Sequence, residues 1–93
     1  MDRITIRLII RGRVQGVGYR WWAQATARRL QLDGWVRNRA DGAVELLAAG
    51  PAAAVEQLLD ACRLGPPSAD VNSVERFEAD DQDLDGFEAR PTV

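Results

Sequence analysis

Three glycines within residues 12–18 separate an alternating segment from a helical one near the start of the chain. Apolar and polar residues alternate over residues 3–11, which predicts a half-buried strand. After the glycines, apolar residues recur at helical spacing over residues 19–30, and Asp33-Gly34 ends this segment. The chain therefore begins with a strand, a tight loop and a helix.

This loop is suited to binding a small anion. Gly16 and Gly18 can adopt positive φ angles, so successive N–H groups can converge, and the helix start adds unpaired amides and a positive dipole. Arg20 adds a permanent charge with forked donors. Two alternatives remain open from these residues: the glycines form only a tight turn, and Arg20 only pairs with a surface acid.

The middle of the chain predicts a hairpin followed by a helix. Strand-like runs at Trp35–Arg39 and Ala43–Ala49 flank an Asp-Gly pair, which is typical of an antiparallel hairpin. Pro51 is expected at the first position of a second helix, which Gly65-Pro66-Pro67 ends. The core face of that helix is predicted to contain Val55, Leu58, Leu59 and Cys62.

The C-terminal third predicts a strand within residues 71–79, of unclear register, then an acidic turn and a short strand around residues 87–90. The order strand, helix, strand, strand, helix, strand is typical of the split βαβ, ferredoxin-like arrangement. We therefore expect an α+β domain spanning residues 1–93, with two helices on one face of an antiparallel sheet.

Composition excludes several functions of this fold. The expected central strands lack the aromatic residues with which RNA-recognition modules stack bases, so no nucleic-acid partner is expected. A single cysteine cannot form a multi-thiol metal site, and it suits a reducing, cytoplasmic compartment. Trp21 stands where a dinucleotide fingerprint needs its third glycine. No segment predicts a signal peptide or a membrane span.

Charge is distributed unevenly along the chain. All twelve basic residues are arginine, and residues 1–40 carry +7 whereas residues 41–93 carry −9. The first part therefore favours anions. The simplest interpretation of most arginines is that they pair at the surface with acids of the second part. Only the arginines beside the glycine loop are not explained in this way.

Two segments resemble the signatures of the acylphosphatase family. They are residues 12–20, GRVQGVGYR, and residues 34–44, GWVRNRADGAV, and the resemblance extends from about Ile4 to Arg90. One departure is Tyr19, where the family more usually has phenylalanine or methionine, and its hydroxyl needs water or a partner. The last strand matches only loosely.

The resemblance implies hydrolysis of the carboxyl-phosphate bond of small acyl phosphates, without metal or cofactor. We expect a monomer, because nothing in the sequence demands more than one chain. Its partners would be the acyl phosphate and inorganic phosphate, and the alternative is a non-catalytic phosphate-binding regulatory module. Catalysis maps onto Arg20 and Asn38, with Asn38 orienting the attacking water. The backbone of the anion loop maps onto Gln15, Gly16, Val17, Gly18, Tyr19 and Arg20.

Two interpretations temper this assignment of roles. Without the resemblance, Asn38 is best explained as a cap of its own hairpin turn. The tryptophans, Trp21, Trp22 and Trp35, are interpreted as packing or partly exposed residues with no catalytic role.

Overall fold

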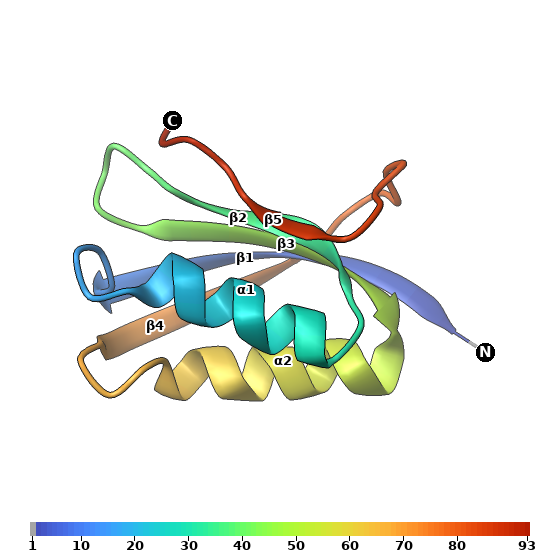
Figure 1. The fold of residues 1–93 in the computed structure, drawn as a ribbon, viewed down its shortest axis with the longest axis horizontal. Helices are drawn as coiled ribbons and strands as arrows, with labels where there is room; N and C mark the ends of the chain where they lie inside the picture. The colour runs from blue at the N-terminus through green and yellow to red at the C-terminus, as the bar shows by residue number, and fades with distance from the viewer. Residues whose placement is uncertain (1) are drawn as a thin grey trace.

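Five strands form one twisted sheet, and two helices lie side by side on one of its faces (Figure 1). The structure is a computed structural model that describes residues 2–93. Its elements are β1 (Arg3–Arg13), α1 (Tyr19–Arg29), β2 (Asp33–Asn38), β3 (Val44–Pro51), α2 (Ala52–Leu64), β4 (Asp70–Glu78) and β5 (Phe87–Ala89). This order confirms the predicted ferredoxin-like fold. None of the helices in residues 2–93 is long and apolar enough to cross a membrane.

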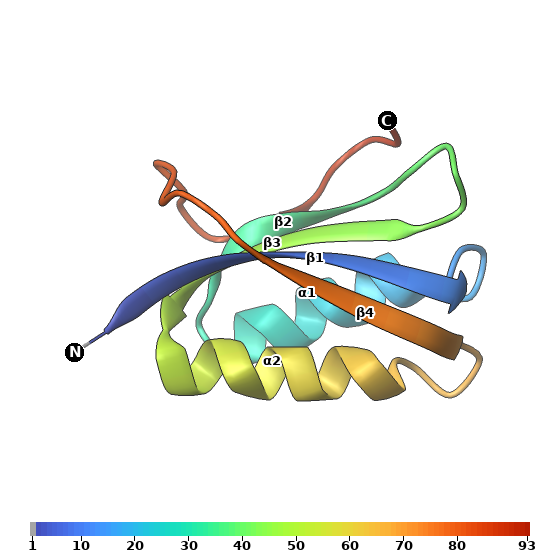
Figure 2. The ribbon, with the colours of Figure 1, turned by 180° about the vertical axis from the view of Figure 1, so that it is seen from behind.

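The sheet is mixed rather than wholly antiparallel as predicted. Its strand order is β4-β1-β3-β2-β5, and only the pair of β2 and β5 is parallel. The chain leaves β4 at one edge of the sheet, reverses direction over the acidic segment of residues 80–85 and returns as β5 along the other edge. The view from behind shows this path (Figure 2). The Asp33 carboxylate anchors this return by accepting the Gly86 N–H at 3.0 Å.

A bulge explains why β4 showed no clear alternation in the sequence. Val74 lies opposite Ile10 and Val71 lies opposite Gly12, so three residues of β4 span two of β1. The extra residue leaves both valines on the helix-covered face, where they pack against the core. Gly12, at φ 129°, approaches the Asp70 carbonyl so closely that a Cβ would collide with it. Glycine is therefore required here by the bulge.

The start of α2 differs by one residue from the prediction. Pro51 ends β3 and caps α2, with φ −57° and an extended ψ of 137°, so the first helical residue is Ala52. Pairing of Pro51 with Arg3 holds it in the sheet. The predicted core face is confirmed, because Val55, Leu58, Leu59 and Cys62 are all buried.

The helix-free face of the sheet is held by a buried carboxylate between two arginines. Glu45 exposes 5% of its side chain and accepts hydrogen bonds from Arg7 Nε at 2.6 Å and Arg37 Nε at 2.8 Å. Burial alone would raise the pKa of Glu45, but the two arginines more than offset it and lower the pKa from its usual 4.5. Pairing between the two parts of the chain is thus confirmed for these residues.

We expect Glu45→Gln to lower the free energy of unfolding at pH 7 by about 1–2 kcal/mol, because charge-assisted hydrogen bonds become neutral ones. A carboxylate whose pKa is lowered in the folded protein stabilises the folded state above pH 4.5. This contribution is lost as the pH falls through the pKa that the group has in the folded protein. Urea unfolding should therefore show the gap between wild type and variant closing below pH 4.5. Glu75→Gln, at a half-exposed pair with Arg11, is the control, and an equal gap in both variants would contradict the account.

Candidate functional site

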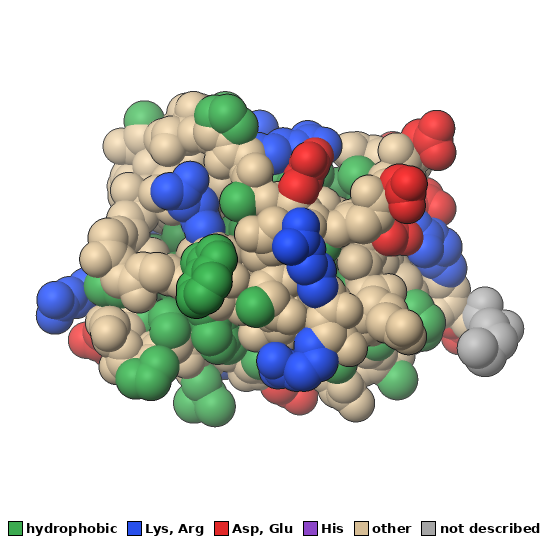
Figure 3. Space-filling model, in the orientation of Figure 1, with side chains coloured by type: hydrophobic (Ala, Val, Ile, Leu, Met, Phe, Trp, Pro, Cys, Tyr) green, Lys and Arg blue, Asp and Glu red, His purple; other side chains and the backbone are tan. Residues whose placement is uncertain are grey.

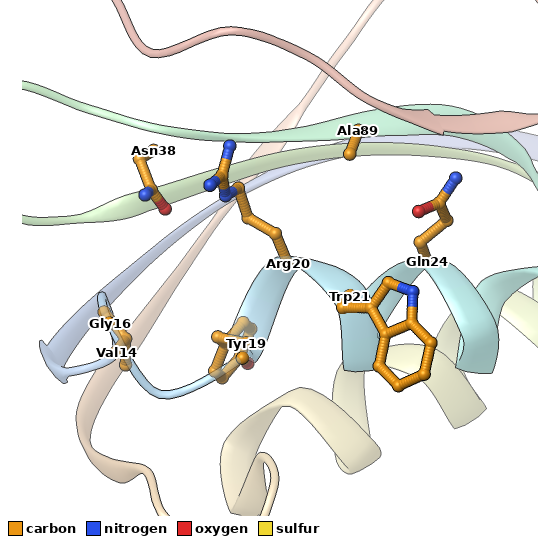
Figure 4. A pocket seen from close by; sticks show the side chains of 9 residues that line it. Val14, Gly16, Tyr19, Arg20, Trp21, Gln24, Asn38 and Ala89 are labelled. Atoms are coloured by element: carbon orange, nitrogen blue, oxygen red, sulfur yellow. The ribbon is translucent and has the colours of Figure 1, made fainter.

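The anion loop, the start of α1 and the ends of two strands enclose a pocket of about 310 Å³ (Figure 4). Figure 4 shows the side chains of Arg20 and Asn38 pointing toward each other across it. The loop and the helix supply most of the lining, and β2 and β5 supply the rest. The lining residues are Val14, Gly16, Gly18, Tyr19, Arg20, Trp21, Gln24, Asn38 and Ala89.

The backbone of the loop leaves its donors unused. Gly16 and Gly18 have φ angles of 73° and 79°, and a Cβ on either would meet no atom within 4 Å. Glycine is thus required by the left-handed conformation and not by crowding. Within residues 2–93, no N–H of residues 15–20 donates a hydrogen bond to a loop, turn or side-chain acceptor. These amides are free to bind an anion.

The start of α1 adds positive charge to the loop. Gly18 is the N-cap, and the first turn of α1 contains no acidic residue that would offset the helix dipole. Arg20 lies in that turn and forms no ion pair within 4.0 Å in residues 2–93. The surface-pair alternative therefore does not hold for Arg20. Its guanidinium keeps all its donors for a ligand.

Strand alternation brings Asn38 to the same pocket. Val36 is fully buried in the core between sheet and helices, and Asn38, two residues later on β2, faces the same side. Asp41 caps the hairpin turn instead, since its carboxylate accepts the Ala43 N–H at 3.0 Å, and this hydrogen bond lowers the pKa of Asp41. The turn-capping alternative for Asn38 is therefore unnecessary.

Gln15 joins the loop to the hairpin. Its side-chain Nε2 donates to the carbonyl oxygens of Arg39 at 2.8 Å and Ala43 at 2.9 Å. Arg39 follows Asn38 directly, so the anchor lies beside the predicted catalytic amide. The side chain of Gln15 thus fixes the loop relative to Asn38, while its backbone remains part of the loop.

Comparison with known proteins identifies relatives of this chain at the level of sequence and of structure. The family model described as Acylphosphatase matches residues 6–89. The chain belongs to the acylphosphatase family. An acylphosphatase of Acidiphilium cryptum is 56% identical over 89 residues, which cover 96% of this chain and 98% of that protein. The solved acylphosphatase structures from Coxiella burnetii and Bacillus subtilis superpose on this chain with TM-scores of 0.92 and 0.90.

Both structural matches also hold at the level of sequence. The Coxiella burnetii acylphosphatase is 36% identical, with 96% of this chain and 94% of that one covered. The Bacillus subtilis acylphosphatase is 38% identical, with 94% and 98% covered. The ferredoxin-like fold of this chain is therefore that of solved acylphosphatases over nearly its whole length.

Tyr19, the departure from the usual acylphosphatase pattern, has a hydrogen-bond partner inside the protein. Its hydroxyl donates to the Cys62 carbonyl at 2.7 Å. That carbonyl belongs to the last turn of α2, and the residue four positions on is Pro66, which has no N–H to donate. Burial raises the pKa of the phenol, so the hydroxyl stays protonated. Tyr19 thus fastens the loop to the end of α2.

We expect Tyr19→Phe to lower the free energy of unfolding by about 1–2 kcal/mol, because the buried Cys62 carbonyl loses its donor. Urea or thermal unfolding measures the change. Cys62→Ser is unsuitable as a control. Burial raises the pKa of the Cys62 thiol to about 12, and a serine hydroxyl at this buried position would need its own hydrogen-bond partner. The control is Leu64→Ala, at an exposed position of the same helix end. A Tyr19→Phe protein as stable as wild type would contradict this role.

The pocket contains some predicted residues and some that sequence reasoning missed. Gly16, Gly18, Tyr19, Arg20 and Asn38 line it as expected. Val17 packs its side chain against the core, so only its backbone belongs to the loop. The residues missed are Val14, Trp21, Gln24 and Ala89.

Two of these missed residues carried a detectable signal. Trp21 and Gln24 lie one and four positions after Arg20, so the helical period places them beside it. Ala89 carried none, because its place depends on the parallel pairing of β5 with β2.

Proposed function

We propose that this chain hydrolyses small acyl phosphates to a carboxylate and inorganic phosphate in the pocket between the anion loop and Asn38. The observation that supports this most strongly is the unpaired Arg20 guanidinium, which faces the Asn38 amide beside unused loop amides (Figure 4). This combination supplies charge stabilisation and an oriented polar group in one place. Those are the main needs of phosphoryl transfer.

In the proposed complex, the loop amides and Arg20 bind the phosphoryl oxygens of the substrate. Negative charge spread over these oxygens in the transition state would be stabilised by donors already held in position. The Gln15 and Tyr19 hydrogen bonds to the hairpin and to α2 support this, because they fix both ends of the loop. No rearrangement of the loop is then needed during the reaction.

Asn38 would position the attacking water. A carboxamide is not a strong base, so Asn38 orients the water by hydrogen bonding and does not deprotonate it. The water oxygen forms a bond to phosphorus while the bond from phosphorus to the acyl oxygen breaks. The bonding pair leaves with the carboxylate, and the water proton passes to a phosphoryl oxygen of the substrate. A carboxylate is a good leaving group, so neither a metal nor a cofactor is needed in this scheme.

Benzoyl phosphate hydrolysis, followed in EDTA, tests this function. We expect turnover by the wild-type protein and competitive inhibition by inorganic phosphate, because product phosphate occupies the same loop. Calorimetry with inorganic phosphate measures binding separately. Binding of phosphate without turnover would contradict the hydrolase and identify the non-catalytic binding module. Turnover that EDTA abolishes would contradict the metal-free scheme.

Three further properties belong to the same proposal. Residues 1–93 act as a single domain, since buried residues of both helices and of the sheet join in one core cluster. The protein acts as a monomer, because the pocket formed within one chain already contains both Arg20 and Asn38. It works in the cytoplasm, where its single buried cysteine suits a reducing compartment. Sedimentation at micromolar concentration tests the monomer.

A further inference from the structure

Trp21 differs from the other two tryptophans in the surroundings of its ring. Trp22 packs edge-to-face on Tyr19, with ring centroids 5.3 Å apart. The guanidinium carbons of Arg37 and Arg90 lie over the ring of Trp35, at 4.4 and 5.2 Å from its centroid. Trp21 makes no such contact in residues 2–93 and is 79% exposed, although it lines the pocket.

The pocket extends beyond Arg20 in the direction of Trp21. Figure 4 shows Gly16 and Asn38 on one side of Arg20, and Trp21, Gln24 and Ala89 on the other. Figure 3 shows hydrophobic side chains gathered over the N-terminal half of α1, next to basic ones. The side of the pocket away from Asn38 is therefore more apolar than the phosphate loop.

In-line displacement determines which part of the substrate would lie there. The attacking and leaving oxygens lie on opposite sides of phosphorus. When water lies beside Asn38, the acyl group leaves on the far side, which is the side of Trp21 and Ala89. A phosphate group is only a few times the size of a water molecule, whose share of the liquid volume is about 30 Å³. A pocket of about 310 Å³ thus has room for an acyl group as well.

We propose that Trp21, Ala89 and the aliphatic part of Gln24 form an acyl subsite that favours flat, apolar acyl groups over small ones. An exposed indole face contacts a planar aromatic ring over a large area, whereas an acetyl group reaches little of it. Gln24 is held beside this subsite by a long hydrogen bond of 3.5 Å to the Phe87 carbonyl. This inference rests on the proposed hydrolysis, and it makes Trp21 a specificity residue.

The test compares kcat/KM for benzoyl phosphate and acetyl phosphate in wild type, Trp21→Ala and Trp21→Phe. We expect Trp21→Ala to lower the benzoyl-to-acetyl ratio about three- to tenfold, the range that one aromatic contact provides. Trp21→Phe should restore the ratio to within about twofold, since phenylalanine keeps a ring. The matched control is Leu64→Ala, which removes an equally exposed apolar side chain outside the pocket and should leave the ratio unchanged.

Each remaining outcome overturns one part of the account. A ratio that Trp21→Ala leaves unchanged, including one where both substrates slow equally, overturns the acyl subsite but leaves the hydrolase standing. A ratio that falls equally in Leu64→Ala overturns the subsite too. Wild-type protein that hydrolyses neither substrate overturns the proposed function, and the subsite with it.

Discussion

Replacing Arg20 by glutamine is expected to lower kcat/KM for benzoyl phosphate by on the order of 10³ or more. Arg20 is the charged side chain lining the pocket, and it forms no ion pair in residues 2–93, so its loss removes a full charge from the phosphate site. Glutamine keeps a polar side chain but not the forked cationic donors. Steady-state kinetics measures the change, and the inhibition constant of inorganic phosphate should rise in parallel.

The matched control for this variant is Arg29→Gln. Arg29 is an exposed arginine at the other end of the same helix and lies outside the pocket, so the variant changes net charge equally. If long-range charge alone attracted the substrate, both variants would lose a similar amount of kcat/KM. Equal losses would contradict a direct contact between Arg20 and the phosphoryl group. Unchanged kinetics in Arg20→Gln would reject its role altogether.

Asn38→Ala is expected to lower kcat by on the order of 10² to 10³, the usual cost of removing one oriented hydrogen-bonding group from a transition state. KM should change little, because the loop and Arg20 still bind the phosphoryl group. This split between kcat and KM distinguishes Asn38 from Arg20. Asn38 is the last residue of β2 and its side chain lines the pocket, whereas Asp41 caps the hairpin turn. The variant should therefore fold normally.

Asn72→Ala provides the comparison for this second variant. Asn72 is the only other asparagine in the sequence and lies exposed at the bulge of β4, outside the pocket. Its kinetics should match those of wild type. A rise in KM with an unchanged kcat in Asn38→Ala would make Asn38 a substrate-binding residue, and this would contradict its proposed role in orienting the water.

Short-range patterns predicted the parts of the site that lie within one element or at its end. The glycines of residues 16–18 predicted the left-handed loop, because their φ angles are a local property. Alternation along β2 predicted that Asn38 shares the face of Val36, and both do lie on the helix-covered side. Roles for these residues came from the family resemblance, since geometry alone does not specify a reaction.

Features that depend on pairing between distant segments were not predictable. The bulge opposite Gly12 hid the alternation of β4, because the extra residue is defined only by the neighbouring strand. The parallel edge strand β5 needed the path of the acidic segment across the sheet. Pro66 signalled that the Cys62 carbonyl lacks its helical donor, but nothing local identified Tyr19, 43 residues before Cys62, as the replacement.

Hydrolysis of benzoyl phosphate in ¹⁸O-labelled water, with EDTA present, tests the central claim most directly. Attack on phosphorus by water held beside Asn38 puts the label into inorganic phosphate and none into benzoate. Mass spectrometry of both products after a single turnover gives the answer. Label in phosphate alone is the predicted result, whereas label in benzoate would mean attack at the carbonyl carbon and would contradict the mechanism.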